Sequence, residues 1–362
     1  MKHLVHIVGY AVRGGCETNC AVFIQHSAEF EHHVIVLGQP GPMTEIWRAL
    51  GAVVSHHFLL ESGWVNFYRQ FHALVKALPM EAAIVWGGIR VPLVVAGLAR
   101  KGCPTVLHAG NPFEQGGRVR FMLWLSAKVL GQPRRVRIMA CSQHVARTFR
   151  GVPYFSQFPL GVCLNPVEIP AKNEHTIRFL DTAKPVRIGM VARLDPIKDH
   201  ATLLGAFAQL RQHWPLAELH LAGDGVLRPK LEAQTRELGI SEAVIFHGSV
   251  SDVPEFLRSL DLFCYFTTER EGMGNALAEA LAHGLPSVIN ELPVLREVAG
   301  AHGHAVKFVQ RDAAVVADAI AELLSDALER RRLSDAAWQR ACEAFAPNKV
   351  VESYLLFLRA SS

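Results

Sequence analysis

Two carboxylates flank a glycine-containing turn in the second half of the chain. Glu271 comes first, and Glu279 follows after seven further residues. The turn begins with Gly272, Met273, Gly274 and Asn275. An apolar run precedes it and a helical pattern follows, so the backbone can approach a ligand and free N–H groups suit an anion such as phosphate. We expect Glu271 to face a ligand and Glu279 to reach a group across the helix start; the alternative is two solvated surface carboxylates.

Two cations follow a strand-like run earlier in the same half. Arg193 and Lys198 lie five residues apart in a turn after residues 186–191. Two cations on a turn at the carboxyl edge of a sheet can hold a pyrophosphate that one cation would hold poorly. From spacing alone, solvated surface cations remain the alternative. The presence of the Glu271 segment favours the pyrophosphate site.

A glycine-rich loop follows the first apolar run of the chain. Read from Gly9, it nearly fits the dinucleotide-binding fingerprint, and it contains Gly14 and Gly15. A nicotinamide oxidoreductase would also need an acidic residue at the end of the second strand, where the chain has residues 37–40, Leu-Gly-Gln-Pro. We therefore expect Gly14 and Gly15 to form a loop that lets a substrate approach, with the oxidoreductase as an alternative.

His108 is the histidine with the best position for chemistry. It ends an apolar run at 105–107, and the carboxyl ends of strands in an open α/β sheet face the ligand. A structural role is the alternative. The chain has 18 histidines but no HExxH spacing, and no DxD motif stands near a strand end. We expect no metal site and no cofactor.

Apolar runs alternate with helical stretches in both halves, which is the pattern of parallel βαβ units. Strands are predicted near 3–9, 32–38, 82–87, 104–108, 136–141, 186–191, 219–222, 244–247, 262–266 and 287–290. Residues 163–185 contain three prolines and no clear period, which predicts a linker. The fold class is therefore α/β with two doubly wound, Rossmann-like domains, and a ligand cleft is expected at the carboxyl ends of the strands.

Composition limits the class of protein. Of 362 residues, 50% are hydrophobic and 19% are charged, which supplies two cores and excludes a disordered chain. No run of eighteen apolar residues occurs, and the first apolar run is too short for a signal sequence. We expect a cytoplasmic protein without a nucleic-acid partner.

Charge is distributed unevenly between the halves. Residues 1–167 hold 16 Lys and Arg against 7 Glu, a net charge of +9, and the remainder holds 21 against 26, a net charge of −5. Residues 118–137 carry six of the cations, and a helix predicted over 117–130 places apolar side chains beside them. This composition predicts contact with an anionic membrane surface on the inner face of the membrane. The alternative is that the apolar side chains of this helix belong to the core and its arginines form a solvated face.

Together these segments resemble family 4 of retaining glycosyltransferases, also called glycosyltransferase group 1, most densely over 186–300. The family's EGFG turn and second Glu are similar to 271–274 and Glu279. Its GR turn and following Lys resemble Ala192-Arg193 and Lys198, and its Gly-Gly-x-Glu loop resembles Gly14 to Glu17. The turn resembling the family's NGVD, at 160–163, lacks the Asn and the Asp.

The resemblance implies a GT-B fold with three parts. Residues 1–165 would form the acceptor-binding domain, 166–346 the nucleotide-sugar donor domain, and 347–362 a helix that crosses back to the first. The donor would be a nucleotide diphosphate sugar, by default a UDP-sugar, and the acceptor a glycan, a lipid-linked sugar or a small molecule, as in polysaccharide biosynthesis. No divalent metal would be needed.

The resemblance also implies roles for the site residues. Arg193 and Lys198 would neutralise the pyrophosphate, Glu279 would hold the ribose, and Glu271 would hold the donor sugar. His108 resembles the family's histidine near the reacting carbon and would have a supporting role there. A nucleotide-sugar 2-epimerase of the same fold is the nearest alternative, followed by a non-catalytic sugar-nucleotide binder and an NAD-dependent oxidoreductase.

Overall fold

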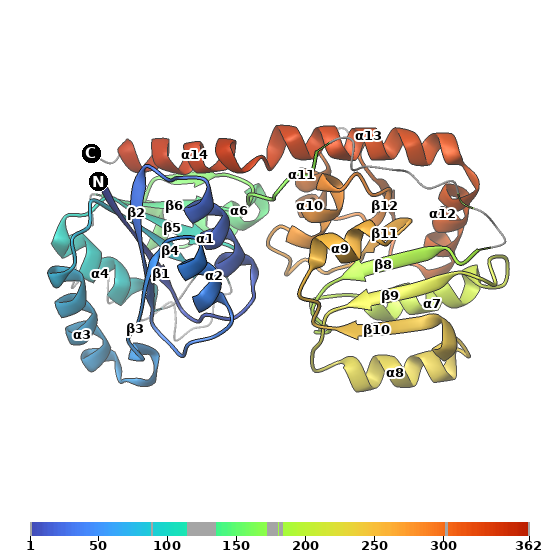
Figure 1. Ribbon diagram of the computed structural model, residues 1–362, viewed down its shortest axis with the longest axis horizontal. Coiled ribbons are helices and arrows are strands. Elements are labelled where there is room, and N and C mark those ends of the chain that lie inside the picture. Colours follow the sequence, from blue (N-terminus) through green and yellow to red (C-terminus); the bar gives the residue numbers. More distant parts are fainter. Residues whose placement is uncertain are drawn as a thin grey trace. The chain divides into compact units, whose positions relative to one another are not determined.

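The chain folds into two compact units, each an α/β structure built on one parallel sheet (Figure 1). The computed structural model describes residues 2–87, 90–113, 135–171, 180, 184–300 and 303–360. Unit 1 combines Met1–Pro166 with Pro347–Ser362, and unit 2 is Val167–Ala346. The predicted class, α/β with two Rossmann-like sheets, is confirmed.

The sheet of unit 1 has seven parallel strands in the order β3-β2-β1-β4-β5-β6-β7. Their bounds are β1 Lys2–Val8, β2 Phe30–Val36, β3 Val53–His56, β4 Ala82–Trp86, β5 Thr105–Ala109, β6 Val136–Ala140 and β7 Leu160–Val162. The sequence predicted the five central strands but not β3 and β7. These two are short edge strands without a buried apolar run, so the apolar pattern that predicts a central strand is missing.

Helices cover the sheet of unit 1, and one of them comes from the C-terminus of the chain. The helices are α1 Gly15–Gln25, α2 Met43–Ala49, α3 Trp64–Ala77, α4 Val91–Lys101, α6 Gln143–Arg150 and α14 Pro347–Arg359. Helix α14 buries Val350, Tyr354 and Leu358 in the same core cluster as Phe23 of α1. The last helix is therefore a structural part of unit 1.

Unit 2 has six parallel strands in the order β10-β9-β8-β11-β12-β13. The strands are β8 Arg187–Val191, β9 Glu218–Ala222, β10 Val244–Gly248, β11 Leu262–Tyr265, β12 Ser287–Asn290 and β13 Lys307–Val309. The helices are α7 His200–Leu210, α8 Arg228–Glu237, α9 Val253–Arg258, α10 Asn275–Ala282, α11 Pro293–Ala299, α12 Ala313–Ser325 and α13 Ala327–Ala344. Aspartate side chains cap α7, α9, α12 and α13 by accepting N–H bonds, which fixes where these helices begin.

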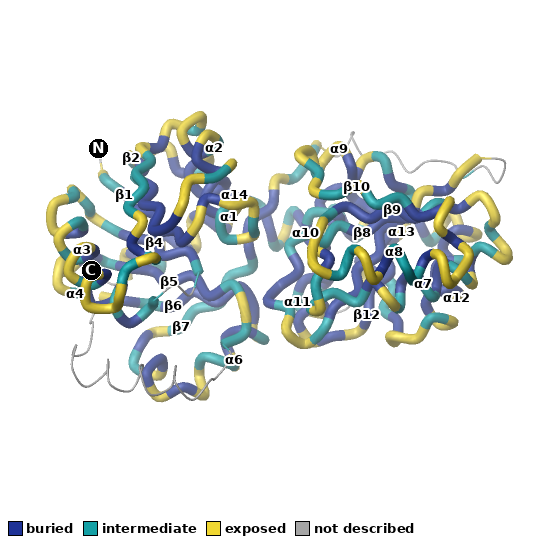
Figure 2. Tube along the Cα trace, turned by 90° about the horizontal axis from the view of Figure 1, so that it is seen from below, coloured by how far each residue is buried: buried dark blue, intermediate teal, exposed yellow. Residues whose placement is uncertain are grey.

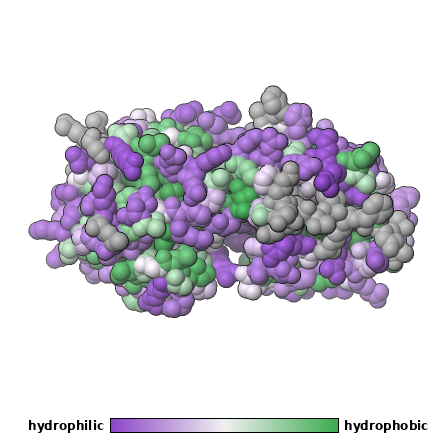
Figure 3. Space-filling model, turned by 45° about the horizontal axis from the view of Figure 1, so that its top comes forward, coloured by the Kyte–Doolittle hydropathy of each residue, from purple (hydrophilic) through white to green (hydrophobic). Residues whose placement is uncertain are grey.

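The central strands form the buried middle of each unit, as the dark segments of Figure 2 show. The order of strands reverses its direction of winding between β1 and β4 and again between β8 and β11. Such switch points are where ligands bind in open α/β sheets, at the carboxyl ends of the strands. On the face drawn in Figure 3, hydrophobic residues form separate patches among hydrophilic ones. In the described part of the chain, no helix is long and apolar enough to cross a membrane.

A chain of buried rings crosses the sheet of unit 1 and determines which ring nitrogens carry protons. The indole N–H of Trp86 donates to Nδ1 of His6 at 3.1 Å, and Nε2 of His6 lies 2.9 Å from Nδ1 of His32. Nε2 of His32 lies 3.0 Å from the carbonyl oxygen of Ser27. All of these bonds form when each imidazole is neutral and protonated at Nε2. Burial, and then the neighbouring His32, keep the pKa of His6 well below its ordinary value.

Acidification should therefore destabilise unit 1. Between the unfolded pKa of about 6.5 and the lower folded pKa of His6, the unfolded chain binds a proton that the folded ring does not, so stability falls as pH falls by up to about 1.4 kcal/mol per pH unit for this ring. Urea unfolding at pH 7 and pH 5.5 measures the effect. His6→Phe should reduce the pH dependence, and the exposed His213→Phe should leave it unchanged. An equal loss of unfolding free energy between pH 7 and pH 5.5 in all three proteins would contradict the role of His6.

Candidate functional site

The loops after β8 and β11 lie together at the carboxyl edge of the sheet in unit 2. The backbone N–H of Asp199 donates to the carbonyl of Phe266 at 3.0 Å, and that of Thr268 donates to the carbonyl of Ile197 at 3.0 Å. The side chain of Asn290, at the end of the next strand, accepts from the backbone N–H of Thr267 at 3.0 Å and donates to its carbonyl at 3.1 Å, which fixes the chain just after β11. The two segments that carry the predicted charges are thus held against each other.

Lys198 and Glu271 form an ion pair at the centre of these loops. Oε2 of Glu271 accepts from the ammonium of Lys198, from the hydroxyl of Tyr265 at 2.9 Å and from that of Thr267 at 3.0 Å. Lys198 also donates to the Tyr265 hydroxyl and lies 4.7 Å from the centre of its ring. The side chains of Lys198 and Glu271 are only 12% and 11% exposed, so little water screens the pair.

The ion pair determines the protonation state of Glu271. Burial opposes ionisation, but the charge of Lys198 and the hydrogen bonds from Lys198, Tyr265 and Thr267 outweigh burial and lower the pKa of Glu271. Burial, and then the charge of Glu271, hold the pKa of Tyr265 far above its ordinary value, so its hydroxyl stays a donor. At neutral pH this network is a carboxylate surrounded by donors.

Glu279 has a different environment on helix α10. The helix begins at Asn275 after Gly274, whose φ of +88° is one that side chains rarely adopt. A Cβ at Gly274 would lie 3.0 Å from the ring of Tyr265, so glycine lets the helix start approach the ion pair. Burial raises the pKa of Glu279 to about 7. Within the described residues, no side-chain hydrogen bond or ion pair satisfies the Glu279 carboxyl, which leaves it available to a ligand.

Arg193 is not part of the Lys198–Glu271 network. Its guanidinium pairs with Asp195 at 2.9 Å and is 75% exposed. The structure thus brings together Lys198, Glu271 and the turn of Gly272, Met273, Gly274 and Asn275, whereas Arg193 stands at the solvent side of the same loop. To contact a phosphate, the guanidinium of Arg193 would have to leave Asp195.

Sequence reasoning missed a second glycine loop in unit 2. Gly223 and Gly225 follow β9, and a Cβ on Gly223 would lie 1.9 Å from the carbonyl oxygen of Ala192. The backbone N–H of Leu194 donates to the carbonyl of Asp224 at 3.0 Å, so this loop supports the loop of Arg193. The Gly-Asp-Gly sequence after a predicted strand was the available signal. Tyr265 and Thr267 were also missed, because nothing in their spacing shows that they bond Glu271.

In unit 1 the structure brings the Gly14-Gly15 turn near His108. Gly14 is the N-cap of α1, which begins at Gly15 after β1. A Cβ on Gly110 would lie 3.1 Å from Nε2 of His108 and 3.3 Å from Sγ of Cys16. The helix start and the end of β5 therefore share one small region at the carboxyl edge of this sheet, lined by glycine backbone.

His108 is buried and is held from the C-terminal helix. Its Nδ1 lies 2.7 Å from the hydroxyl of Tyr354, and its Nε2 has no hydrogen-bond partner in the described structure. Burial lowers the pKa of His108 to about 4, so the ring is neutral. No other acceptor for the Tyr354 hydroxyl occurs among the described residues, which favours donation from Tyr354 to Nδ1. In that arrangement Nε2 carries the proton and is a free donor.

Removing the Tyr354 hydroxyl should disturb the tautomer of His108. In histidine-labelled protein, ¹⁵N spectra of the parent should show the Nε2–H form, and Tyr354→Phe should populate both forms because the donor to Nδ1 is lost. Its free energy of unfolding should fall by about 1–2 kcal/mol. Tyr154→Phe, a buried tyrosine of the same unit that does not bond His108, is the control. An Nδ1–H form in the parent would show that the bond runs the other way.

The predicted membrane segment lies largely outside the described residues, since 114–134 are not described. Two of its arginines are described. Arg135 donates to the carbonyl of Gly102 at 3.0 Å. Arg137 bonds the carbonyl of Ala360 and lies 5.1 Å from the centre of the Phe357 ring. At least these two cations thus have intramolecular partners.

Part of the chain is similar in sequence to known proteins. Residues 173–340 match the family model "Glycosyl transferases group 1". Among curated proteins, the chain is 36% identical over 104 residues to the "Putative glycosyltransferase EpsF" of Bacillus subtilis (strain 168). It is 36% identical over 92 residues to the "N-acetylgalactosamine-N,N'-diacetylbacillosaminyl-diphospho-undecaprenol 4-alpha-N-acetylgalactosaminyltransferase" of Campylobacter jejuni. These alignments span 29% and 25% of this chain and about a quarter, 27% and 24%, of the relatives.

Similarity of structure extends over the whole chain. The crystal structure of Anabaena Alr3699/HepE in complex with UDP and glucose superposes with a TM-score of 0.80, covers 99% of this chain and 100% of its own, and is 17% identical. The two-sheet architecture is thus the GT-B fold, and the segment at 173–340, which carries the Lys198–Glu271 network and Glu279, matches the glycosyl transferases group 1 family.

Proposed function

We propose that this protein is a retaining glycosyltransferase that moves a sugar from a nucleotide diphosphate sugar to a glycan or lipid-linked acceptor. The observation that carries the proposal is the buried Lys198–Glu271 pair beside the start of α10, with the carboxyl of Glu279 unpaired on that helix. These groups provide a cation and backbone N–H donors for a diphosphate and carboxylates for sugar hydroxyls. A UDP-sugar is the proposed donor, because the structurally similar Anabaena protein forms a complex with UDP and glucose.

The roles follow from the environments of the two carboxylates. Glu271 is ionised and already accepts from three side chains, which suits a group that orients hydroxyls of the donor sugar. Glu279 is partly buried without a partner and would accept from the ribose hydroxyls, which would stabilise its ionised form. In this proposal Gly14 and Gly15 would leave room for substrate in unit 1, and His108 would donate from Nε2 to the substrate. Lys198 and the start of α10, with Arg193 after release from Asp195, would stabilise the departing diphosphate without a metal ion.

An acceptor-dependent assay tests the proposed activity. Purified protein, given UDP-sugars and a panel of glycan and polyprenyl-diphosphate-sugar acceptors, should release UDP only with donor and acceptor together, and EDTA should not reduce the rate. The anomeric configuration of the product, read by NMR, should match that of the donor. Conversion of the UDP-sugar into an epimer without acceptor, or an absorbance change with NADH, would contradict transfer.

Substitutions should separate nucleotide binding from chemistry. Lys198→Ala should weaken UDP binding by roughly 1.5–3 kcal/mol, because a charge-assisted bond is lost, and Glu279→Ala should weaken it through the ribose. Glu271→Ala should lower turnover with little loss of UDP affinity, since it releases Lys198 from its partner. Calorimetry with UDP and uridine measures the affinities, and the acceptor-dependent release of UDP measures turnover. The exposed Arg236→Ala is the control. Uridine should bind Lys198→Ala as it binds the parent; equal UDP affinity in Lys198→Ala and the parent would remove Lys198 from the site.

We further propose that the enzyme contacts anionic membranes from the cytoplasmic side. The support is the net charge of +9 in residues 1–167 and the lipid-linked acceptor that the name of the Campylobacter relative specifies. Each basic residue near an anionic bilayer contributes about 1 kcal/mol, so several together hold a protein reversibly.

Vesicle co-sedimentation tests this contact. Binding should require anionic lipid, fall as salt rises, and be lost in Arg118→Glu/Arg120→Glu. The same double charge change at Arg331 and Arg332, on helix α13 of unit 2, is the control and should retain binding. Absence of binding to anionic vesicles at low salt would leave an enzyme that acts on a soluble acceptor.

A further inference from the structure

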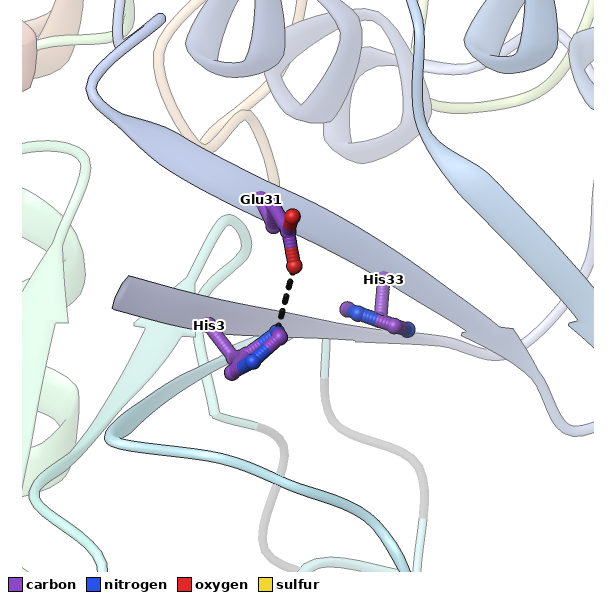
Figure 4. A group of neighbouring side chains, drawn as sticks. All are labelled: His3, Glu31 and His33. Atoms are coloured by element: carbon purple, nitrogen blue, oxygen red, sulfur yellow. Dashed lines mark ion pairs between the residues drawn. The ribbon is translucent and has the colours of Figure 1, made fainter. Parts of the chain in front are cut away.

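Three side chains that can ligate a metal meet on the sheet of unit 1, outside the proposed transfer site. They are His3 on β1 and Glu31 and His33 on β2 (Figure 4). The parallel register pairs His3 with Glu31 and Val5 with His33. Because side chains alternate along a strand, Glu31 and His33 face the same side of the sheet. His3 is the register partner of Glu31, so its side chain faces that side too. The sequence did not predict the group, since 27 residues separate His3 from Glu31.

The geometry is close to that of a metal site. One ligand atom from each residue lies within 4.8 Å of the others, and Nδ1 of His3 is 3.0 Å from Oε2 of Glu31. The ring centres of His3 and His33 are 5.4 Å apart. Ligand bonds of about 2.0–2.2 Å in a tetrahedral zinc site place ligand atoms roughly 3.3–3.5 Å apart. Side-chain rotations that move the ligand atoms by about 1 Å would therefore close the group around one ion.

The chemistry of the three donors suits a transition metal. Two imidazoles and one carboxylate are ligands that Zn²⁺, Co²⁺ and Ni²⁺ accept, whereas Mg²⁺ and Ca²⁺ prefer oxygen. The ion-pair contact of Nδ1 of His3 with Glu31 lacks hydrogen-bond geometry, and this nitrogen has no hydrogen-bond partner in the described structure. An ion between the three groups would satisfy it.

The group is open to solvent, and the backbone of Glu81 lies next to it. The side chains of His3 and Glu31 are 28% and 48% exposed, so an ion can enter and keep a water ligand. Glu81 precedes β4, and its backbone N–H donates to the carbonyl of His3 at 3.0 Å. Glu81 thus occupies the register position next to His3 on the side opposite Glu31.

We propose that His3, Glu31 and His33 bind a divalent transition metal ion of the Zn²⁺ class, which cross-links β1 and β2. The residues lie at the amino ends of these strands, whereas His108 and the Gly14-Gly15 turn lie at the carboxyl ends. The ion would therefore stabilise unit 1 without taking part in transfer. The same three ligands leave a fourth position for water.

Cobalt and zinc titrations of the full chain test the site. Protein purified without a histidine tag and dialysed against EDTA should bind one Co²⁺, with the visible absorption of a tetrahedral or five-coordinate ion, and Zn²⁺ should displace it. Zn²⁺ should raise the thermal midpoint and slow hydrogen exchange in residues 2–5 and 30–33. UDP binding should be the same with and without Zn²⁺.

Variants decide whether these residues are the ligands. His33→Asn and Glu31→Gln should each weaken Zn²⁺ binding at least tenfold and remove the cobalt spectrum, and their thermal midpoints in EDTA should equal that of the parent. Glu31→Gln keeps the shape of the side chain, so it reports ligation even where a histidine variant folds poorly. The exposed His213→Asn is the matched control and should bind as the parent does. No binding at about 100 µM Zn²⁺, or binding unchanged in both ligand variants, would overturn the proposal.

Discussion

Parallel pairing of the strands is the constraint on which both units depend. It places every strand's carboxyl end at the same edge of its sheet, so residues distant in the chain become neighbours there. In unit 2 the loops after β8 and β11 meet because these strands are adjacent in the order β10-β9-β8-β11-β12-β13. Lys198 and Glu271 can therefore bond although they are 73 positions apart in the chain. The same rule acts at the amino ends of β1 and β2, where His3 meets Glu31.

Their different partners give Glu271 and Glu279 opposite properties. Glu271 remains ionised because a cation and two hydroxyls surround it, and the pKa of Glu279 rises to about 7 because burial is not compensated by a partner. A buried ion pair contributes little net stability, since desolvation offsets the attraction. The pair lies beside a helix that begins after Gly274, so it has a position as well as a charge.

The C-terminal helix connects the end of the chain to His108 in unit 1. Helix α14 packs into the core with Phe23, and its Tyr354 bonds the ring of His108. Trp86 is stacked on His6 and contacts the ring of His108, so the chain of neutral rings and the candidate donor share one buried cluster. Because such rings have one donor and one acceptor nitrogen, each hydrogen bond determines the direction of the next. Truncation of helix α14 would therefore remove part of the core of unit 1 and the hydrogen bond to His108.

The sequence by itself determined the α/β class, the central strands of both sheets and the segments that carry Lys198, Glu271, Glu279 and Gly14-Gly15. These follow from local patterns: apolar runs of strand length, glycines before helices and charges at strand ends. Only the tertiary structure decided that Tyr265 and Thr267 join Glu271, that Arg193 pairs outward with Asp195, that Tyr354 holds His108, and that His3, Glu31 and His33 meet. These contacts join residues from different strands or opposite ends of the chain, or depend on the direction of one side chain, and no spacing along the chain encodes either the neighbouring strand or that direction.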